Sequence, residues 1–173
     1  IDSLVSFVHS NDIELTVVGP EGPLCLGLVD RLRKLGHKAF GPTQAVARLE
    51  GSKSYAKTLA REHNIPGPDF KTLPSRHAAI SYLDRLEPKD YPLVIKADGL
   101  AAGKGVRICA DRIEAEEHIL DCTDRSRFGD AGKTIVIEEF IKGREVSIVV
   151  ITGGQTLIVL DPAQDYKAAY EGN

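Results

Sequence analysis

The chain has 173 residues, of which 42% are hydrophobic and 27% charged, and its formal net charge is -3. This length suits one ordinary domain or two small ones, and the composition is that of a globular protein. The charge leaves no basic footprint for nucleic acid, and no apolar run approaches the roughly 18 residues that a membrane span needs. We therefore expect neither a nucleic-acid nor a membrane partner.

The cysteines and histidines form no metal-binding or disulfide pattern. Cys25, Cys109 and Cys122 are odd in number and widely spaced, which favours free thiols in a reducing, cytoplasmic compartment. The five histidines show no paired metal-ligand spacing, so we predict no metal ligand among them. The chain contains no methionine and opens inside a predicted helix, which suggests a piece of a longer protein.

The first fifty residues predict a parallel βαβ unit. Residues 2–9 form a helix, and residues 14–18 form a strand that ends at a Gly-Pro turn. A second helix is expected from apolar residues at helical spacing, followed by a short strand within residues 37–43. The residues that define this helix are Leu24, Leu28, Leu32 and Leu35, with Gly36 at its end.

The turn after the first strand is the candidate anion site of this unit. In parallel sheets, ligands bind beyond the carboxyl ends of the strands. The free N–H groups at the start of the following helix also attract anions. Gly19, Pro20 and Glu21 occupy this position.

Residues 51–90 are expected to form a partly helical link between two sheet systems. Ser52 can cap a helix that continues to residue 64, and the prolines of "IPGPDF" end it. Residues 75–86 are again helical in pattern. The buried side of the first of these helices is expected to carry Tyr55, Ala56, Leu59 and Ala60.

From Tyr91 onwards the pattern is that of a small antiparallel sheet backed by a helix. "YPLVIKA" and "GVRICA" predict two strands, and Asp111 with Glu114 signals the start of a helix over residues 112–120. Three more strands are expected within "KTIVIEEF", "REVSIVVI" and "QTLIVL", the last two joined by a hairpin turn at Gly153 and Gly154. The fold class is therefore α/β plus α+β.

The loop in "IKADGLAAGKGVRI" is the first candidate ligand site of this half. The Walker A pattern fails because three residues, not four, separate Gly99 from Gly103, and Gly105 stands where Ser or Thr is needed. The dinucleotide pattern fails because a β-branched segment, not a helix, follows. Glycines let backbone N–H groups approach phosphate oxygens, and Lys96 and Lys104 add positive charge. The alternative is a flexible hairpin tip with a solvated lysine.

The segment "IVIEEFIKGRE" is the second candidate site. Its strand runs into a short stretch whose free backbone groups can pair with an adenine edge. Glu145 opens the next expected strand and can offer its carboxylate to ribose hydroxyls. The alternative is solvated glutamates at a strand end. The adenine stretch consists of Glu138, Glu139, Phe140 and Ile141.

The motifs "GPEGPL", "FGPT", "LEGSKSYAK", "VIKADGLAAGKGV", "FGDAGKTIVIEEFIKGREVS" and "PAQDYK" occur in this order. In this the chain resembles the phosphoribosylamine–glycine ligase family, also called glycinamide ribonucleotide synthetase, of the ATP-grasp superfamily. The resemblance implies ligation of glycine to 5-phosphoribosylamine through glycyl phosphate, with ATP and Mg²⁺ as cofactors, in purine biosynthesis. The products are glycinamide ribonucleotide, ADP and phosphate.

The resemblance also implies a domain plan. Residues 1–50 would be part of a Rossmann-like substrate domain, and residues 51–90 the helical link and start of the ATP-grasp. Residues 91–160 would form the small ATP-grasp lid domain. Residues 161–173 would begin the large ATP-grasp domain.

Residue roles follow from the matched motifs. Lys57 and Lys96 would contact ATP phosphates, and Lys53 is the rival for the role of Lys57. The catalytic set would be Lys96, Lys104 and Lys167, and the substrate set Gly19, Pro20, Glu21, Asp165 and Lys167. The cofactor set would be Lys57, Lys96, Gly103, Lys104, Gly105, Glu138, Glu139, Phe140, Ile141 and Glu145.

Two family segments are missing, a glycine-rich N-terminal turn and a "GPNTGGMG" loop, and the magnesium ligands would also lie outside this chain. We therefore expect this polypeptide, a monomer, not to complete the reaction. The competing interpretations are another ATP-grasp carboxylate–amine ligase or carboxylase, a non-catalytic nucleotide-binding fragment, and an interaction domain.

Overall fold

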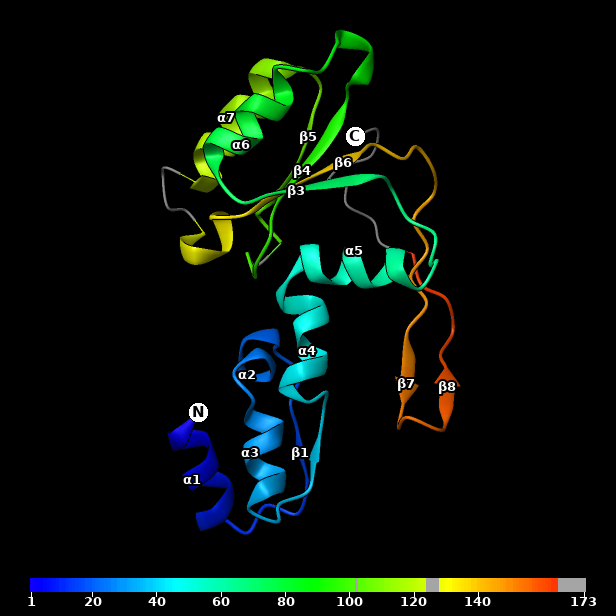
Figure 1. The fold of residues 1–173 in the computed structure, drawn as a ribbon. Coiled ribbons are helices and arrows are strands. Elements are labelled where there is room, and N and C mark those ends of the chain that lie inside the picture. Colours follow the sequence, from blue (N-terminus) through cyan, green and yellow to red (C-terminus); the bar gives the residue numbers. More distant parts are fainter. Residues whose placement is uncertain (102, 124–127, 165–173) are drawn as a thin grey trace, which may run out of the picture. The chain divides into compact units, whose positions relative to one another are not determined.

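The computed structural model describes residues 1–101, 103–123 and 128–164. They belong to two compact units, Ile1–Phe140 and Ile141–Asn173, which are described separately below. Figure 1 follows the elements along the chain. None of the helices that the structure describes combines the length and apolar character needed to cross a bilayer.

The start of the first unit is the expected parallel βαβ arrangement. Strands β1 and β2 pair in parallel, with Thr16 opposite Ala39. A small apolar core lies under them, centred on Val29 and Leu32, which are 0% exposed. The elements are α1 (Asp2–Ser10), β1 (Thr16–Val17), α2 (Glu21–Cys25), α3 (Leu28–Lys34) and β2 (Ala39–Phe40).

The single helix expected across Leu24 to Leu35 is wrong, because it is broken in two. Gly27 adopts a left-handed φ of 77° between α2 and α3, a conformation that costs a glycine little. Leu24 and Leu28, on either side of the break, are still four residues apart, so the helical periodicity alone does not reveal the break. Leu35 lies beyond the end of α3 and is 59% exposed.

Two consecutive helices follow β2. The helix α4 (Gln44–Gly51) was not expected from the sequence. The helix α5 (Lys53–Glu62) begins as predicted, because the Ser52 hydroxyl accepts a hydrogen bond from the Tyr55 N–H at 3.2 Å. Its expected buried side is only half-buried, since no residue of α5 is fully covered.

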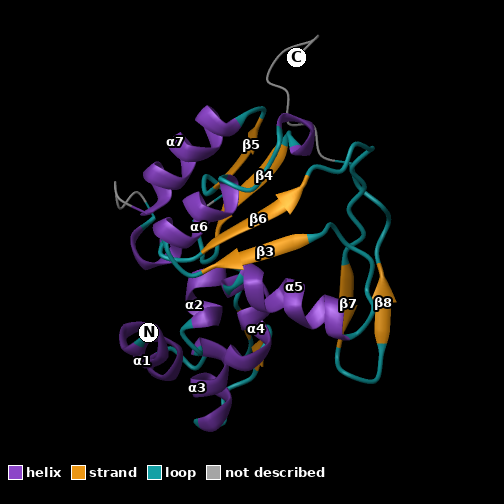
Figure 2. Ribbon diagram, turned by 45° about the horizontal axis from the view of Figure 1, so that its top comes forward, coloured by secondary structure: helices purple, strands orange, loops and turns teal. Residues whose placement is uncertain are grey.

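A four-stranded antiparallel sheet forms the rest of the first unit, in the order β3-β6-β4-β5. Helices α6 and α7 lie side by side over one face of it (Figure 2). The predicted capping of α7 is confirmed, because the Glu114 N–H donates to Asp111 Oδ1 at 3.0 Å. The elements are β3 (Phe70–Leu73), α6 (Arg76–Leu83), the 3₁₀ turn η1 (Pro88–Asp90), β4 (Leu93–Ala97), β5 (Val106–Cys109), α7 (Arg112–Thr123), η2 (Gly129–Gly132) and β6 (Ile135–Glu139).

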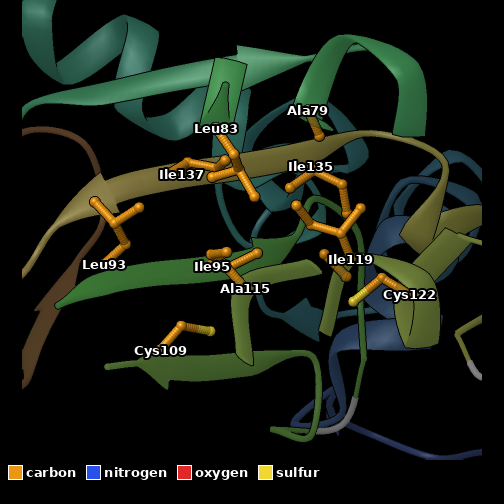
Figure 3. Packing of buried hydrophobic residues seen from close by; sticks show 11 residues of the cluster. Ala79, Leu83, Leu93, Ile95, Cys109, Ala115, Ile119, Cys122, Ile135 and Ile137 are labelled. Carbon is orange, nitrogen blue, oxygen red and sulfur yellow. The ribbon is translucent and has the colours of Figure 1, made fainter. Parts of the chain in front are cut away.

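The main core lies between this sheet and its two helices (Figure 3). Along β4, Leu93, Ile95 and Ala97 are buried in this core, whereas the residues between them point to the other face. Cys109 and Cys122 are buried free thiols of the same core. Burial raises the pKa of the Cys109 thiol to about 11.

Residues 51–90 also contribute to this sheet, which corrects the expectation that they only link two sheet systems. Strand β3 pairs with β6, and Ala79 and Leu83 of α6 are 0% exposed in the main core. The strand was missed because it is a short edge strand in which Lys71 and Thr72 are exposed, so it has little apolar signal.

The second unit contains a hairpin of β7 (Val150–Thr152) and β8 (Leu157–Val159), which is a separate two-stranded sheet. The predicted turn is confirmed, with Gly154 at a φ of 94°. The expected strand start at Glu145 is wrong, since the chain there is irregular and β7 begins five residues later. Residues 91–160 therefore do not form one sheet.

Candidate functional site

The candidate site is centred on Glu138, near the end of β6. Its side chain is 3% exposed and lies on the sheet face opposite α6 and α7, because its neighbour Ile137 belongs to the helix-covered core. Lys96 comes from the adjacent strand β4 and lies on the same face. Its Nζ atom is 2.9 Å from Glu138 Oε1 and 3.0 Å from Oε2.

A second lysine reaches the same carboxylate from a helix. Lys57, in the second turn of α5, places its Nζ atom 2.9 Å from Glu138 Oε2. The ring of Phe70, which pairs with Glu138 across β3 and β6, lies 5.8 Å from this ammonium and 4.9 Å from the Arg61 guanidinium. Two of the predicted phosphate ligands, Lys57 and Lys96, are therefore brought together.

The cluster of two ammonium groups and one carboxylate carries a net positive charge. A carboxylate this deeply buried needs paired partners to remain ionised. The side chains of Lys57 and Lys96 are 19% and 22% exposed, so each ammonium is less covered than the carboxylate. The arrangement offers N–H donors and positive charge to an incoming anion.

Lys53 takes a different place from its rival Lys57. Its ammonium donates to the carbonyl of Gly99 at 2.9 Å, where the glycine loop begins. Desolvation by burial lowers the pKa of Lys53, against the opposing effect of Glu50 and Asp98. The structure therefore ties Lys53 to the loop and directs Lys57 to Glu138.

Asp98 is the residue of this region that the sequence interpretation missed. Its carboxylate accepts hydrogen bonds from the Ser54 N–H at 2.6 Å and from the Ser52 hydroxyl at 3.1 Å. Its backbone carbonyl accepts from the Lys53 N–H at 3.0 Å. Asp98 thus joins the start of α5 to the base of the glycine loop. An acidic residue after one strand and a serine-rich helix start were its only sequence signals.

The glycines of the loop have different local roles. Gly105 is buried, and a Cβ there would lie 2.6 Å from Ala101 Cβ and 3.1 Å from Ala97 Cβ. A Cβ on Gly99 would lie 2.8 Å from Ala131 Cβ. Both glycines therefore permit close packing at the base of the loop.

The tip of the loop is the exposed part. Gly103 is exposed and has a φ of 74°, which favours glycine. Lys104 is also exposed, and its N–H donates to the Ala101 carbonyl at 2.9 Å. No contact among the described residues joins Lys104 to Glu138.

The adenine stretch differs from the prediction in its first two residues. Strand β6 is central, between β3 and β4, so Glu138 offers no free strand edge. The Glu139 N–H donates to the Asp69 carbonyl at 3.1 Å, and its side chain accepts the Asp69 N–H at 3.0 Å. Only Phe140, which is 39% exposed, and Ile141, which begins the second unit, lie beyond the strand.

A hollow of about 1090 Å³ lies around the β3 edge of the sheet. It is lined by Lys57, Glu138 and Glu139 of the predicted set, but not by Lys96 or the glycine loop. Because Ile137 and Glu138 both line it and face opposite sides of the sheet, the hollow wraps around the edge strand. Its wall also carries the basic Arg61 and Lys71 and the acidic Asp69 and Asp90.

Of the remaining predicted residues, only the turn of Gly19, Pro20 and Glu21 belongs to the first unit. The exposed turn of Gly19, Pro20 and Glu21 lies at the start of the five-residue helix α2, and no contact among the described residues joins it to Glu138. Glu145 belongs to the second unit. Asp165 and Lys167 lie outside the described residues.

Metal ligands are a separate matter. The parts of the chain that the structure describes hold no group of three or more His, Cys, Asp or Glu side chains placed to bind a metal ion.

Comparisons with known proteins match the chain in two segments. The N domain of phosphoribosylglycinamide synthetase matches residues 1–50, and its ATP-grasp (A) domain matches residues 51–173. Phosphoribosylamine–glycine ligase of Rhodopirellula baltica is 48% identical over 175 residues, covering 99% of this chain and 40% of that protein. The chain thus spans about 40% of the length of the curated relatives it matches.

Solved structures agree in fold. The phosphoribosylamine–glycine ligase of Thermotoga maritima has a TM-score of 0.67 and 32% identity, over 87% of this chain and 36% of that one. A D-alanine–D-alanine ligase of Bacillus anthracis, solved with ATP, has a TM-score of 0.68 over 95% of this chain and 52% of that one. At 22% identity, the second likeness shows the fold alone.

Proposed function

Since this chain belongs to the phosphoribosylglycinamide synthetase family, over both its N domain and its ATP-grasp domain, we propose that it forms part of an ATP-dependent carboxylate–amine ligase. The reaction joins glycine to 5-phosphoribosylamine and yields glycinamide ribonucleotide, ADP and phosphate, a step of purine biosynthesis. The observation that carries this proposal is the meeting of Lys57 and Lys96 on one buried carboxylate, beside the strand that leads into the glycine loop.

The chemistry requires an activated carboxylate. The glycine carboxylate attacks the γ-phosphate of ATP, and the resulting glycyl phosphate is then attacked by the amine of phosphoribosylamine, which releases phosphate. Charge builds on the phosphate oxygens during transfer, so fixed cations nearby lower the barrier. Lys57 and Lys96 are proposed to bind these oxygens, and the Lys104 ammonium on the exposed loop tip is proposed to add a third charge on closure.

The loop between β4 and β5 is proposed to act as the lid. Glycyl phosphate is lost to water unless the site excludes solvent. The closely packed Gly99 and Gly105 anchor the base of the loop, whereas Gly103 and Lys104 are exposed at its tip. An anchored base with a free tip suits closure over a phosphate chain.

The base and sugar of the nucleotide are assigned to the end of β6. Phe140 and Ile141 extend beyond the strand and are proposed to contact adenine, together with the exposed side of Glu139. Glu145 is proposed to bind ribose. The turn of Gly19, Pro20 and Glu21 and the residues Asp165 and Lys167 are proposed to face the phosphoribosyl substrate.

Magnesium fits this chain less well than the nucleotide. The donor set around Glu138 is cationic, which suits phosphate oxygens and repels a metal cation. With no acidic cluster in the described ranges, the ligands of Mg²⁺ would come from elsewhere in the full ligase. When bound, Mg²⁺ would neutralise charge on the phosphates.

Further proposals concern the state of the protein. We assign it to the cytoplasm, as a monomer whose partners are glycine and 5-phosphoribosylamine. Since the chain spans about 40% of its relatives, we propose that it binds ATP and does not complete ligation alone. Steady-state formation of glycinamide ribonucleotide by the 173-residue chain would contradict this.

Calorimetric titration of the chain with MgATP tests the proposed function. We expect binding that is abolished by Lys96→Met and that weakens as salt increases, because the contact is ionic. The matched control is Arg107→Met, which removes a cation on the neighbouring strand β5 whose partner is Glu117. Absence of heat for MgATP with a folded chain, or equal binding by Lys96→Met, would overturn the proposal. The alternative is that the chain only binds nucleotides and is not part of a ligase. In that case MgATP should bind, but adding the remaining segments of the ligase should not produce glycinamide ribonucleotide.

A further inference from the structure

We propose that the side chain of Glu138 is a positioning residue that holds the Lys57 and Lys96 ammonium groups in the geometry that receives the phosphate chain. This inference rests on the proposed ATP-dependent function. It differs from the expected role of Glu138, which was a backbone contact to adenine. The backbone of Glu138 is engaged between two strands, so its side chain is the group left to act.

The carboxylate makes contacts that a simple core residue would not need. Lys57 Nζ lies 2.9 Å from Oε2, and Lys96 Nζ lies 2.9 Å from Oε1 and 3.0 Å from Oε2. The two ammonium groups are therefore less than about 6 Å apart. They belong to α5 and β4, which are separate elements, and like charges this close repel unless an anion lies between them.

Burial separates the roles of the three groups. Glu138 is 3% exposed, and the two lysine side chains are several times more accessible. The carboxylate is therefore the covered partner and the ammonium groups form the outer part of the cluster. An anion that approaches from solvent meets the lysines before it meets Glu138.

The hydrogen-bonding capacity of lysine allows both contacts at once. Each ammonium has three N–H donors, and one directed at Glu138 leaves two for phosphate oxygens. The nucleotide therefore does not have to displace the carboxylate. A lysine that is already held in place also loses less side-chain entropy on binding than a free one.

Two roles for Glu138, neutralising the lysines and positioning them, predict opposite effects of one substitution. Glu138→Gln keeps the size of the side chain and raises the net charge of the cluster from about +1 to about +2. If Glu138 only neutralises the lysines, a polyanion should bind this variant more tightly. If Glu138 positions them, the variant should bind more weakly, because the repelling ammonium groups move apart. The sign of the change therefore decides between the two.

The experiment uses the complete chain with Glu138→Gln, Glu138→Asp and the control Glu117→Gln. Glu117 is also paired with a cation, Arg107, at 3.2 Å, but it is exposed and belongs to α7, which covers the other face of the sheet. By calorimetry we expect Glu138→Gln to weaken MgATP binding about tenfold and Glu138→Asp to weaken it less, since a shorter carboxylate reaches one lysine better than two. Glu117→Gln should bind as the unmodified chain does.

A second measurement needs no ligand. In ¹⁵N NMR of the lysine ammonium groups, Glu138→Gln should increase the mobility of both Lys57 and Lys96, and Glu117→Gln should change neither. Equal or tighter MgATP binding by Glu138→Gln, or unchanged lysine mobility, would overturn the inference. Failure of the unmodified chain to bind MgATP would count against the proposed function instead, and the lysine mobility would still decide the role of Glu138. If Glu138→Gln does not fold, Glu138→Asp carries both measurements.

Discussion

The two faces of the four-stranded sheet have opposite chemistry, although the same strands build both. Towards α6 and α7, Ile95 and Ile137 are buried among apolar side chains. On the other face, Lys96 and Glu138 follow them directly in the sequence and form a charged pair. Because side chains alternate along a strand, a shift of one residue would exchange the two sets. The apolar face therefore sets the register, and the register places the candidate site.

Breaking the apolar face should have the largest effect. Ile137→Ala is expected to lower the free energy of unfolding by about 2–5 kcal/mol, because it leaves a cavity between the sheet and its helices. Urea unfolding followed by circular dichroism measures this. Ile113→Ala on α7 is the control, since its side chain is 78% exposed. If the two variants were equally stable, the described core would be wrong.

Breaking the charged face should lower the free energy of unfolding less than breaking the apolar face, but it should weaken MgATP binding more. Lys96→Met leaves Glu138 with Lys57 as its remaining lysine, and we expect a loss of about 1–3 kcal/mol in unfolding free energy. MgATP binding should disappear in the same variant. Arg107→Met breaks an exposed, solvent-screened pair and should lower the unfolding free energy less than Lys96→Met does. A stable Lys96→Met that still binds MgATP would remove the distinction between the faces.

The base of the glycine loop should tolerate no side chain. Gly105→Ala brings a Cβ to 2.6 Å from Ala101 Cβ, so the backbone must shift. We expect a loss of about 1–2 kcal/mol in thermal or urea unfolding. Gly143→Ala is the comparison, because nothing lies within 4 Å of its added Cβ. Equal stability of the two variants would show that the loop base is loosely packed.

Disrupting the junction of α5 with the glycine loop should affect MgATP binding more than it affects the free energy of unfolding. Asp98→Ala removes the partner of the Ser54 N–H and should cost about 1 kcal/mol, as loss of a helix cap does. It should also weaken MgATP binding, because α5 carries Lys57. Asp111→Ala removes the cap of α7 and should cost similar stability without changing binding. Equal binding losses in the two variants would contradict a specific role for Asp98.

The smallest expected effect near neutral pH concerns Cys109. Its folded pKa is raised to about 11 from an ordinary value of 9.0, so the folded state keeps a proton that the unfolded state releases. The stabilising contribution is full below pH 9.0 and is lost as the pH rises towards about 11. Cys109→Ala should make the unfolding free energy less dependent on pH in this window. An unchanged pH dependence would show that the thiol is not protected.

The site was only partly predictable because its parts come from distant segments. Lys57 and Lys96 could be proposed from local motifs, but their shared partner Glu138 was expected to act through its backbone. Sequence spacing shows which residues alternate along a strand, whereas strand order decides which strands are central. Placing β3 beside β6 is what removed the free edge from Glu138 and Glu139. The role of Asp98 was hidden for the same reason, since its partners lie 44–46 residues away.

The sequence by itself determined the local elements. Short runs rich in β-branched residues specified β4 to β6, Ser52 and Asp111 specified helix starts, and paired glycines specified the hairpin turn. These signals are local because they depend on backbone geometry and on neighbours within a few residues. Only the tertiary structure decided that β3 and α6 join the sheet and that two lysines meet on Glu138. Such contacts depend on which surfaces pack against each other. That packing involves segments far apart in the sequence, so no local pattern can specify it.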